Sequence, residues 1–243
     1  RDCLLSRGLG DVYKRQEVRR LIEKYEMPVL GYTPEHNAYP YNYMIGSEAQ
    51  RRDAVDYLKL SLEMAKEMGA EFVLTSPANG GYLATYDQLW SRLEKNIQEL
   101  GDYAAKLEIK LVVEALTPYE SNFFTRANDL VELFRRVDNP YVVGMCDIVP
   151  PFVQHESIMA YFDKLGNKMD HMHIIDGENG SDTHLIPGEG NIPIKEMLYE
   201  MKRIGYDKTA TLELVTNYIN EPRFYAKRAI DNMRELMAEA GIV

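Results

Sequence analysis

Four residues that can bind a metal ion stand at the ends of four consecutive apolar runs. They are Glu114 in "IKLVVEAL", Asp147 in "YVVGMCDI", a histidine in "DHMHIIDG" and Glu213 in "ATLELVT". A buried carboxylate without a partner costs several kcal/mol, so a bound cation would explain an acid at the end of a buried run. Three carboxylates and one imidazole suit a divalent ion such as Mn²⁺, Co²⁺, Ni²⁺ or Mg²⁺ better than a structural Zn²⁺. The pattern predicts such a site.

The histidine of this set is either His171 or His173, because alternate residues of a strand point to the same face. One of the two would bind the metal, and the other would be a buried histidine with hydrogen-bond partners. Any single acid at a strand end is more often a surface residue or a helix cap. Four such residues in phase over four consecutive units are what indicates a common site.

Five helices are predicted from apolar residues at spacings of three and four, at about 55–69, 89–104, 130–137, 194–205 and 221–241. Short apolar runs between them read as buried parallel strands: "MPVLGYTP", "EFVLTSPA", "IKLVVEAL", "YVVGMCDI", "DHMHIIDG" and "ATLELVT". Strands that alternate with helices predict an α/β domain with a parallel sheet.

A doubly wound sheet and a barrel both show this alternation. In a flat sheet the four strand ends would spread over roughly 15 Å, at about 4.8 Å per strand, whereas a curved barrel brings them together. Barrel active sites lie at the C-terminal strand ends, and a unit of such a barrel averages roughly 31 residues. No GxGxxG follows a predicted strand, which disfavours a dinucleotide site. We therefore predict a TIM barrel, of which about six βα units are recognisable.

Composition narrows the class of protein. The chain has 243 residues, a formal net charge of −10 and five histidines. This acidity disfavours binding to nucleic acid or to anionic membranes, and with it a DNA-repair endonuclease of the same fold. No apolar run approaches the roughly 20 residues that span a bilayer. No secretion signal is recognisable, and two cysteines make no disulfide framework, so we expect a cytoplasmic protein.

The first sixteen residues, "RDCLLSRGLGDVYKRQ", differ from the rest of the chain. They show neither a helical nor a strand period, and "DVYKRQ" matches a translated sequencing-library adapter. We therefore predict that residues 1–16 are a non-native segment and that residues 17–243 form a partial TIM-barrel domain.

Five longer motifs resemble one family. They are "GYTPEHNAYPYN", "EALTPYESN", "YFDKLGNK", "SDTHLIPGEG" and "LELVTNYINEPRFYA". From about Gln16 to the C-terminus the chain resembles the ketose 3-epimerases, within the superfamily of xylose-isomerase-like barrels. The resemblance implies a (β/α)₈ barrel of which this chain supplies the third to eighth strands. It also implies a metal held by Glu114, Asp147, His173 and Glu213, with the two glutamates as the acid/base pair.

The resemblance further implies residues that contact the sugar. Glu120 matches a family glutamate with this role. The family commonly has a histidine where this chain has Pro150, and an arginine where it has Asn179, and we expect Asn179 to contact the sugar. We expect His184, in "SDTHLIPGEG", to supply the missing polar contact.

The tyrosine-rich segment after the first predicted strand could form the mouth of the site, through Tyr32, Tyr39 and Tyr41, or could simply pack the rim. The implied activity is metal-dependent inversion of carbon 3 of a ketose or a ketosamine. A sugar isomerase or dehydratase with the same metal site, and an inactive fragment that binds metal or sugar, remain alternatives. The expected partner is a small sugar or sugar-amine, and two open sheet edges would favour a homo-oligomer.

Overall fold

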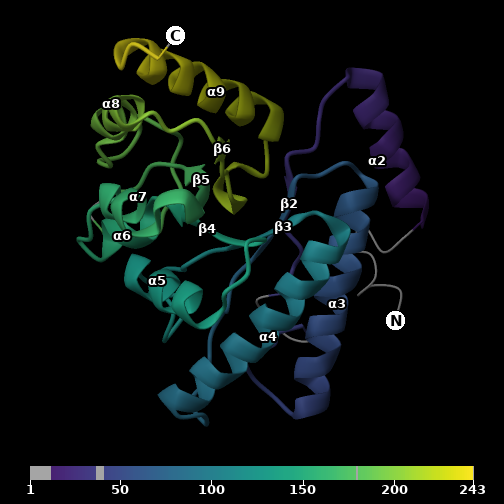
Figure 1. Cartoon of the computed structure of the whole chain (residues 1–243). Helices are drawn as coiled ribbons and strands as arrows, with labels where there is room; N and C mark the ends of the chain where they lie inside the picture. The colour runs from purple at the N-terminus through teal and green to yellow at the C-terminus, as the bar shows by residue number, and fades with distance from the viewer. Residues whose placement is uncertain (1–11, 37–40, 179, 243) are drawn as a thin grey trace. The chain divides into compact units, whose positions relative to one another are not determined.

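The computed structural model describes residues 12–36, 41–178 and 180–242 (Figure 1). The strands are β1 (Gly31–Tyr32), β2 (Phe72–Thr75), β3 (Lys110–Val113), β4 (Val142–Asp147), β5 (Met169–Ile174) and β6 (Thr209–Leu212). The α-helices are α2 (Val12–Tyr25), α3 (Glu48–Glu67), α4 (Tyr86–Leu107), α5 (Ala127–Arg136), α6 (Val149–Val153), α7 (Met159–Leu165), α8 (Ile194–Ile204) and α9 (Pro222–Glu239). Two short 3₁₀ turns are η1 (Gly166–Lys168) and η2 (Thr216–Tyr218).

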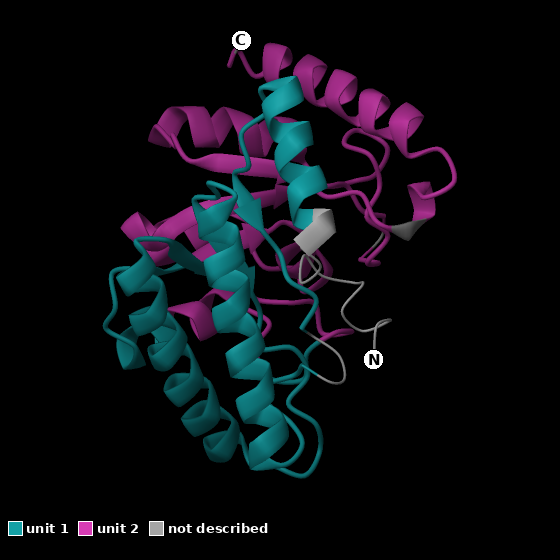
Figure 2. Ribbon diagram, turned by 90° about the vertical axis from the view of Figure 1, so that its right-hand side faces the viewer, with its two compact units in different colours: residues 1–114, 121–123, 132–143 teal, residues 115–120, 124–131, 144–243 magenta. Residues whose placement is uncertain are grey.

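The chain divides into two compact units (Figure 2). Unit 1 comprises residues 1–114, 121–123 and 132–143, and unit 2 comprises residues 115–120, 124–131 and 144–243. The six strands follow one another along a single sheet in the order of the sequence, β1 to β6. This order is the one that a barrel built from successive βα units requires.

In unit 1, β1, β2 and β3 pair in parallel, and the two long helices α3 and α4 pack against each other. Both helices begin with a capping box, Ser47 with Gln50 and Thr85 with Gln88, in which side chains satisfy the first free backbone N–H groups. The apolar faces of α3 and α4 are buried, so the helices form where their sequence period placed them.

Ion pairs also join α3 to α4. Glu99 of α4 lies 2.8 Å from Arg52 and 2.6 Å from Lys59, both on α3. The pairs are partly exposed, so each contributes little by itself, and the buried apolar faces carry most of the packing.

In unit 2, β4, β5 and β6 pair in parallel, and Asp147 stands opposite His173 in the register. The two short helices α6 and α7 connect β4 to β5, and a loop at 177–192 precedes α8. The strand β5 is buried along its whole length. Because a strand of a parallel sheet is covered on both faces, its polar residues Asp170, His171 and His173 are buried as well.

All six predicted strands and all five predicted helices are confirmed, with β1 reduced to two residues. The short helices α6 and α7 lack a helical period long enough to predict. Helix α2 begins at Val12 and so crosses the boundary expected at Gln16, while residues 1–11 lie outside the described residues. The assignment of residues 1–16 to a non-native segment stays a prediction.

Within the part of the chain that the structure describes, no helix combines the length and the apolar character needed to cross a membrane.

Candidate metal and substrate site

The four predicted ligands lie at strand ends. Glu114 follows β3 directly, Asp147 is the last residue of β4, and His173 is the last but one of β5. Glu213 follows β6 directly. Glu114, Asp147 and His173 are more than nine-tenths buried, which is unusual for ionisable side chains and calls for compensating charge.

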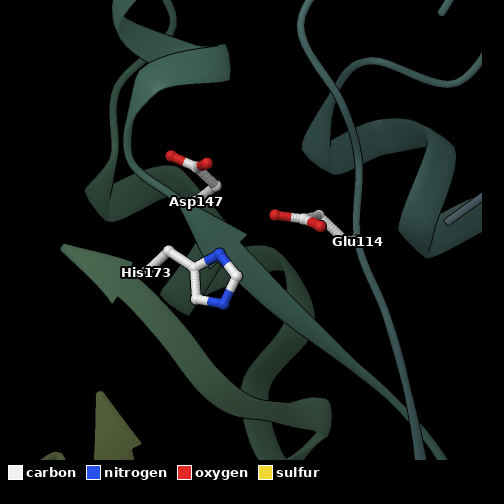
Figure 3. Close-up of side chains that lie close together, drawn as sticks. All are labelled: Glu114, Asp147 and His173. Carbon is white, nitrogen blue, oxygen red and sulfur yellow. The ribbon is translucent and has the colours of Figure 1, made fainter. Parts of the chain in front are cut away.

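Two groups of three side chains, one of which also includes His184, lie close enough together to hold a metal ion. Glu114, Asp147 and His173 each offer one ligand atom, and these atoms lie within 4.8 Å of one another. Figure 3 shows the three side chains close together. Asp147, His184 and Glu213 form a second group by the same measure. Carboxylate oxygens and imidazole nitrogens are ligands that a divalent transition ion accepts, so the residues present fit such an ion.

The two histidines of β5 have different surroundings. Nδ1 of His171 lies 2.7 Å from Oγ1 of Thr209, and its Nε2 lies 3.0 Å from Oγ1 of Thr211. Burial, reinforced by the neighbouring His173, lowers the pKa of His171 to about 4. Both ring nitrogens of His171 are therefore engaged by β6, whereas His173 belongs to the group described above.

Local chain geometry holds Asp147. Its Oδ1 accepts a hydrogen bond of 2.8 Å from the backbone N–H of Val149, in the first turn of α6. Pro150 and Pro151 follow there, where a missing backbone N–H costs nothing. One carboxylate oxygen of Asp147 is thus tied to the backbone, and Oδ2 lies 3.9 Å from Nε2 of His184.

The loop 177–192 is organised by Asp176, which is 1% exposed. Its carboxylate accepts four backbone N–H groups at 2.9–3.0 Å, those of Gly177, Gly188, Gly190 and Ile192. A Cβ on Gly190 would lie 2.4 Å from the carbonyl oxygen of Gly177 and 2.5 Å from Oδ1 of Asp176, so glycine is required there. One buried acid therefore fixes the loop that carries His184.

His184 stands among carboxylates. Its Nδ1 lies 2.9 Å from Oδ1 of Asp182, and its Nε2 lies 3.3 Å from Oε2 of Glu213. Burial alone would lower the pKa of His184, but Asp182, Glu213 and Asp147 outweigh it and raise the pKa to about 10.

Glu213 shows the complementary shift. Burial alone would raise the pKa of its carboxyl group, but His173 and His184 outweigh burial and hold that pKa well below its usual range. Nδ1 of His173 lies 3.2 Å from Oε2 of Glu213. The same oxygen thus faces two imidazoles, which favours an ionised carboxylate.

Glu120 is exposed and belongs to a turn with Thr117. Its Oε2 accepts hydrogen bonds from the backbone N–H of Thr117 at 3.2 Å and from its hydroxyl at 2.9 Å. The same hydroxyl lies 3.2 Å from Oδ2 of Asp182.

Sequence reasoning missed Thr117, Asp176 and Asp182. A signal existed for Asp182 alone, as an acid two residues before His184.

The predicted mouth residues are partly described. Tyr32 ends β1 in unit 1 and interacts with Tyr57 of α3, whose pKa is raised to about 12 by burial and then by Tyr32. Tyr41 stacks on Tyr57 with ring centroids 4.1 Å apart. These contacts favour a packing role for Tyr32 and Tyr41. Tyr39 and Asn179 lie outside the described residues.

The fold and the sequence together define the class of protein. The family of xylose isomerase-like TIM barrels matches residues 7–236, so the chain belongs to that family. This confirms the barrel fold that the sequence predicts.

Individual relatives narrow the comparison. The chain is similar to fructoselysine 3-epimerase of Shigella flexneri, with 46% identity over 92% of this chain and 81% of the relative. Among solved structures it resembles a D-tagatose 3-epimerase-like protein, with a TM-score of 0.79, 21% identity, and coverage of 95% and 85% of the two chains. It also resembles the IolI protein with a bound zinc atom, with a TM-score of 0.73, 19% identity, and coverage of 91% and 80%.

Proposed function

We propose that this chain is a sugar epimerase, an enzyme of the isomerase class, that inverts carbon 3 of a ketose or ketosamine with the help of a divalent cation. The observation that carries this proposal is the 46% identity with fructoselysine 3-epimerase over 92% of the chain. Fructoselysine, converted to psicoselysine, is therefore the first substrate to test. The carboxylate and imidazole ligands at the strand ends support the metal requirement.

The chemistry assigns a role to each ligand. Carbon 3 of a ketose is next to the carbonyl group, so removal of its proton gives an enediolate. A divalent cation held by Glu114, Asp147, His173 and Glu213 would act as a Lewis acid toward that negative charge. A single base can return the proton only to the face it came from. Inversion therefore needs two groups, and we assign proton transfer on the two faces to Glu114 and Glu213.

Two further residues are assigned to the sugar. Nε2 of His184 lies 3.3 Å from Oε2 of Glu213, and we assign to His184 the polar contact for which the family commonly has a histidine and an arginine at the positions of Pro150 and Asn179. Glu120 is exposed and can accept hydrogen bonds from sugar hydroxyls. Tyr32 and Asn179 stay predictions from the sequence.

The test is proton NMR in D₂O with fructoselysine, after incubation with Mn²⁺, Co²⁺, Ni²⁺ or Mg²⁺ and removal of the ion by a chelator. Fructose is run in parallel. We expect metal-dependent loss of the carbon 3 proton signal and the appearance of a second epimer. The Glu213→Gln variant should lose this activity, and Glu221→Gln, a matched change at an exposed glutamate, should keep it.

Other outcomes contradict the proposal. An aldose product would indicate a sugar isomerase, and a dehydrated product would indicate a dehydratase. Metal binding without any carbon 3 exchange on either sugar would refute epimerisation of these substrates.

A further inference from the structure

The acid Asp182 lies beside the site but belongs to neither group of possible metal ligands. It stands in the loop 177–192, with a side chain that is 20% exposed, and its Oδ1 is 2.9 Å from Nδ1 of His184. A side chain this accessible contributes little to the core. Its contacts are made instead to residues that face the candidate site.

We propose that Asp182 is a positioning residue: by holding Nδ1 of His184 it turns Nε2 of that ring toward Glu213. This proposal rests on the proposed function. An imidazole has two distinct nitrogens, and the partner of one decides what the other presents. With Nδ1 held by Asp182, Nε2 faces Oε2 of Glu213 at 3.3 Å. His184 and Asp182 thus restrict the carboxylate that transfers the proton on one face of the sugar.

The same acid extends the network to a second functional residue. Oδ2 of Asp182 lies 3.2 Å from the hydroxyl of Thr117, which is 2.9 Å from Oε2 of Glu120. A hydroxyl has one hydrogen to donate, so it serves one of these carboxylates at a time. The backbone N–H of Thr117 also donates to Oε2 of Glu120, at 3.2 Å. A sugar hydroxyl bound at Glu120 would therefore release the Thr117 hydroxyl to Asp182.

The loop provides a rigid base for this arrangement. Asp176 holds the loop through four backbone N–H groups, and its own backbone pairs with Leu185 in both directions at 2.8 and 2.7 Å. His184 immediately precedes Leu185 and has a positive φ of 46°. A backbone this constrained sets the place of the ring, and the side chain of Asp182 sets its orientation.

The experiment compares Asp182→Asn with Asp163→Asn, which removes the same charge from an exposed position on α7. Each variant is incubated in D₂O with fructoselysine and, separately, with psicoselysine. NMR measures deuterium in the recovered starting sugar, which reports the base on one face, and in the product. In Asp182→Asn we expect kcat to fall about tenfold with KM changed less than about threefold, because orientation acts mainly on the transition state.

The discriminating result is asymmetry. Because His184 contacts Glu213, deuterium wash-in should slow far more from one epimer than from the other, whereas general loosening would slow both equally. A second measurement needs no activity: in the metal-free protein, ¹⁵N spectra of the five histidines should show shifted ring signals for His184 in Asp182→Asn. A His184→Asn variant identifies those signals, and the ring signals of His171 should stay in place.

Equal slowing of both epimers, unchanged ring signals, or weaker metal binding with normal exchange at saturating metal would each overturn the positioning role. If the wild type exchanges carbon 3 protons and Asp182→Asn matches it, this inference fails while the proposed function stands. If the wild type exchanges nothing, the proposed function fails and the inference falls with it.

Discussion

Replacement of Asp176 by asparagine tests how the loop 177–192 is held. The carboxylate accepts four backbone N–H groups, two on Oδ1 from Gly177 and Ile192 and two on Oδ2 from Gly188 and Gly190. Asparagine has nearly the same shape, but one of its two polar atoms is a donor. Two of the four N–H groups would then face an NH₂ group instead of an acceptor.

The magnitude follows from that count. A hydrogen bond to a charged acceptor contributes about 1.5–3 kcal/mol, so loss of two of them predicts a destabilisation of about 3–6 kcal/mol. Because Asp176 is 1% exposed, water cannot replace the lost partners without opening the loop. Whole domains are stable by only about 5–15 kcal/mol, so this one atom exchange removes a large share of the margin.

Amide hydrogen exchange gives the local assay and urea unfolding the global one. We expect faster exchange at the N–H groups of one pair, either Gly188 and Gly190 or Gly177 and Ile192, depending on which way the amide turns. The free energy of unfolding should fall accordingly, whereas Asp163→Asn should change neither quantity. A loss below about 1 kcal/mol with unchanged protection at all four amides would refute the reasoning, since it would mean that these bonds do not hold the loop.

Two further predictions concern charged and ionisable groups away from the loop. Hydrogen bonds from Arg52 and then from Lys59 outweigh burial and hold the pKa of Glu99 at about 2, so its stabilisation is fully present above about pH 4.5 and is lost as the pH falls toward 2. Glu99→Gln should therefore lower the free energy of unfolding by about 1 kcal/mol near neutral pH, a small value because solvent screens this partly exposed group. In urea unfolding, the stability of the variant should depend less on pH between 4.5 and 2 than that of the wild type. Parallel curves for the two proteins would contradict this. His173→Asn should weaken Co²⁺ binding about 100-fold in calorimetric titration. His171→Asn should leave the Co²⁺ affinity nearly unchanged but lower Tm, because Thr209 and Thr211 lose a hydrogen-bond partner. The reverse pattern would make His171 the ligand.

Local sequence patterns were sufficient for the framework of this protein. The helices α3 and α4 can be recognised in the sequence by the period of their apolar residues and by their capping boxes. Both patterns depend on residues within a few positions of one another. The strands end where apolar runs end, so Glu114, Asp147 and Glu213 could be placed at strand ends without coordinates. These residues recur once per βα unit, and the regular length of that unit is itself a property of the sequence.

The tertiary structure decided what each polar side chain meets. His171 and His173 have the same parity on β5, and contacts with Thr209 and Thr211 of β6 are what engage His171. Nothing near Asp176 in the sequence indicates that its carboxylate accepts hydrogen bonds from backbone N–H groups as far along the chain as that of Ile192.

Asp182 gives a third case, since Thr117 lies 65 residues away along the chain. Composition, period and motif report the conformation of neighbouring residues. Hydrogen-bond partners brought together by the fold depend on loop closure and side-chain direction, and these are determined only once the strands have paired.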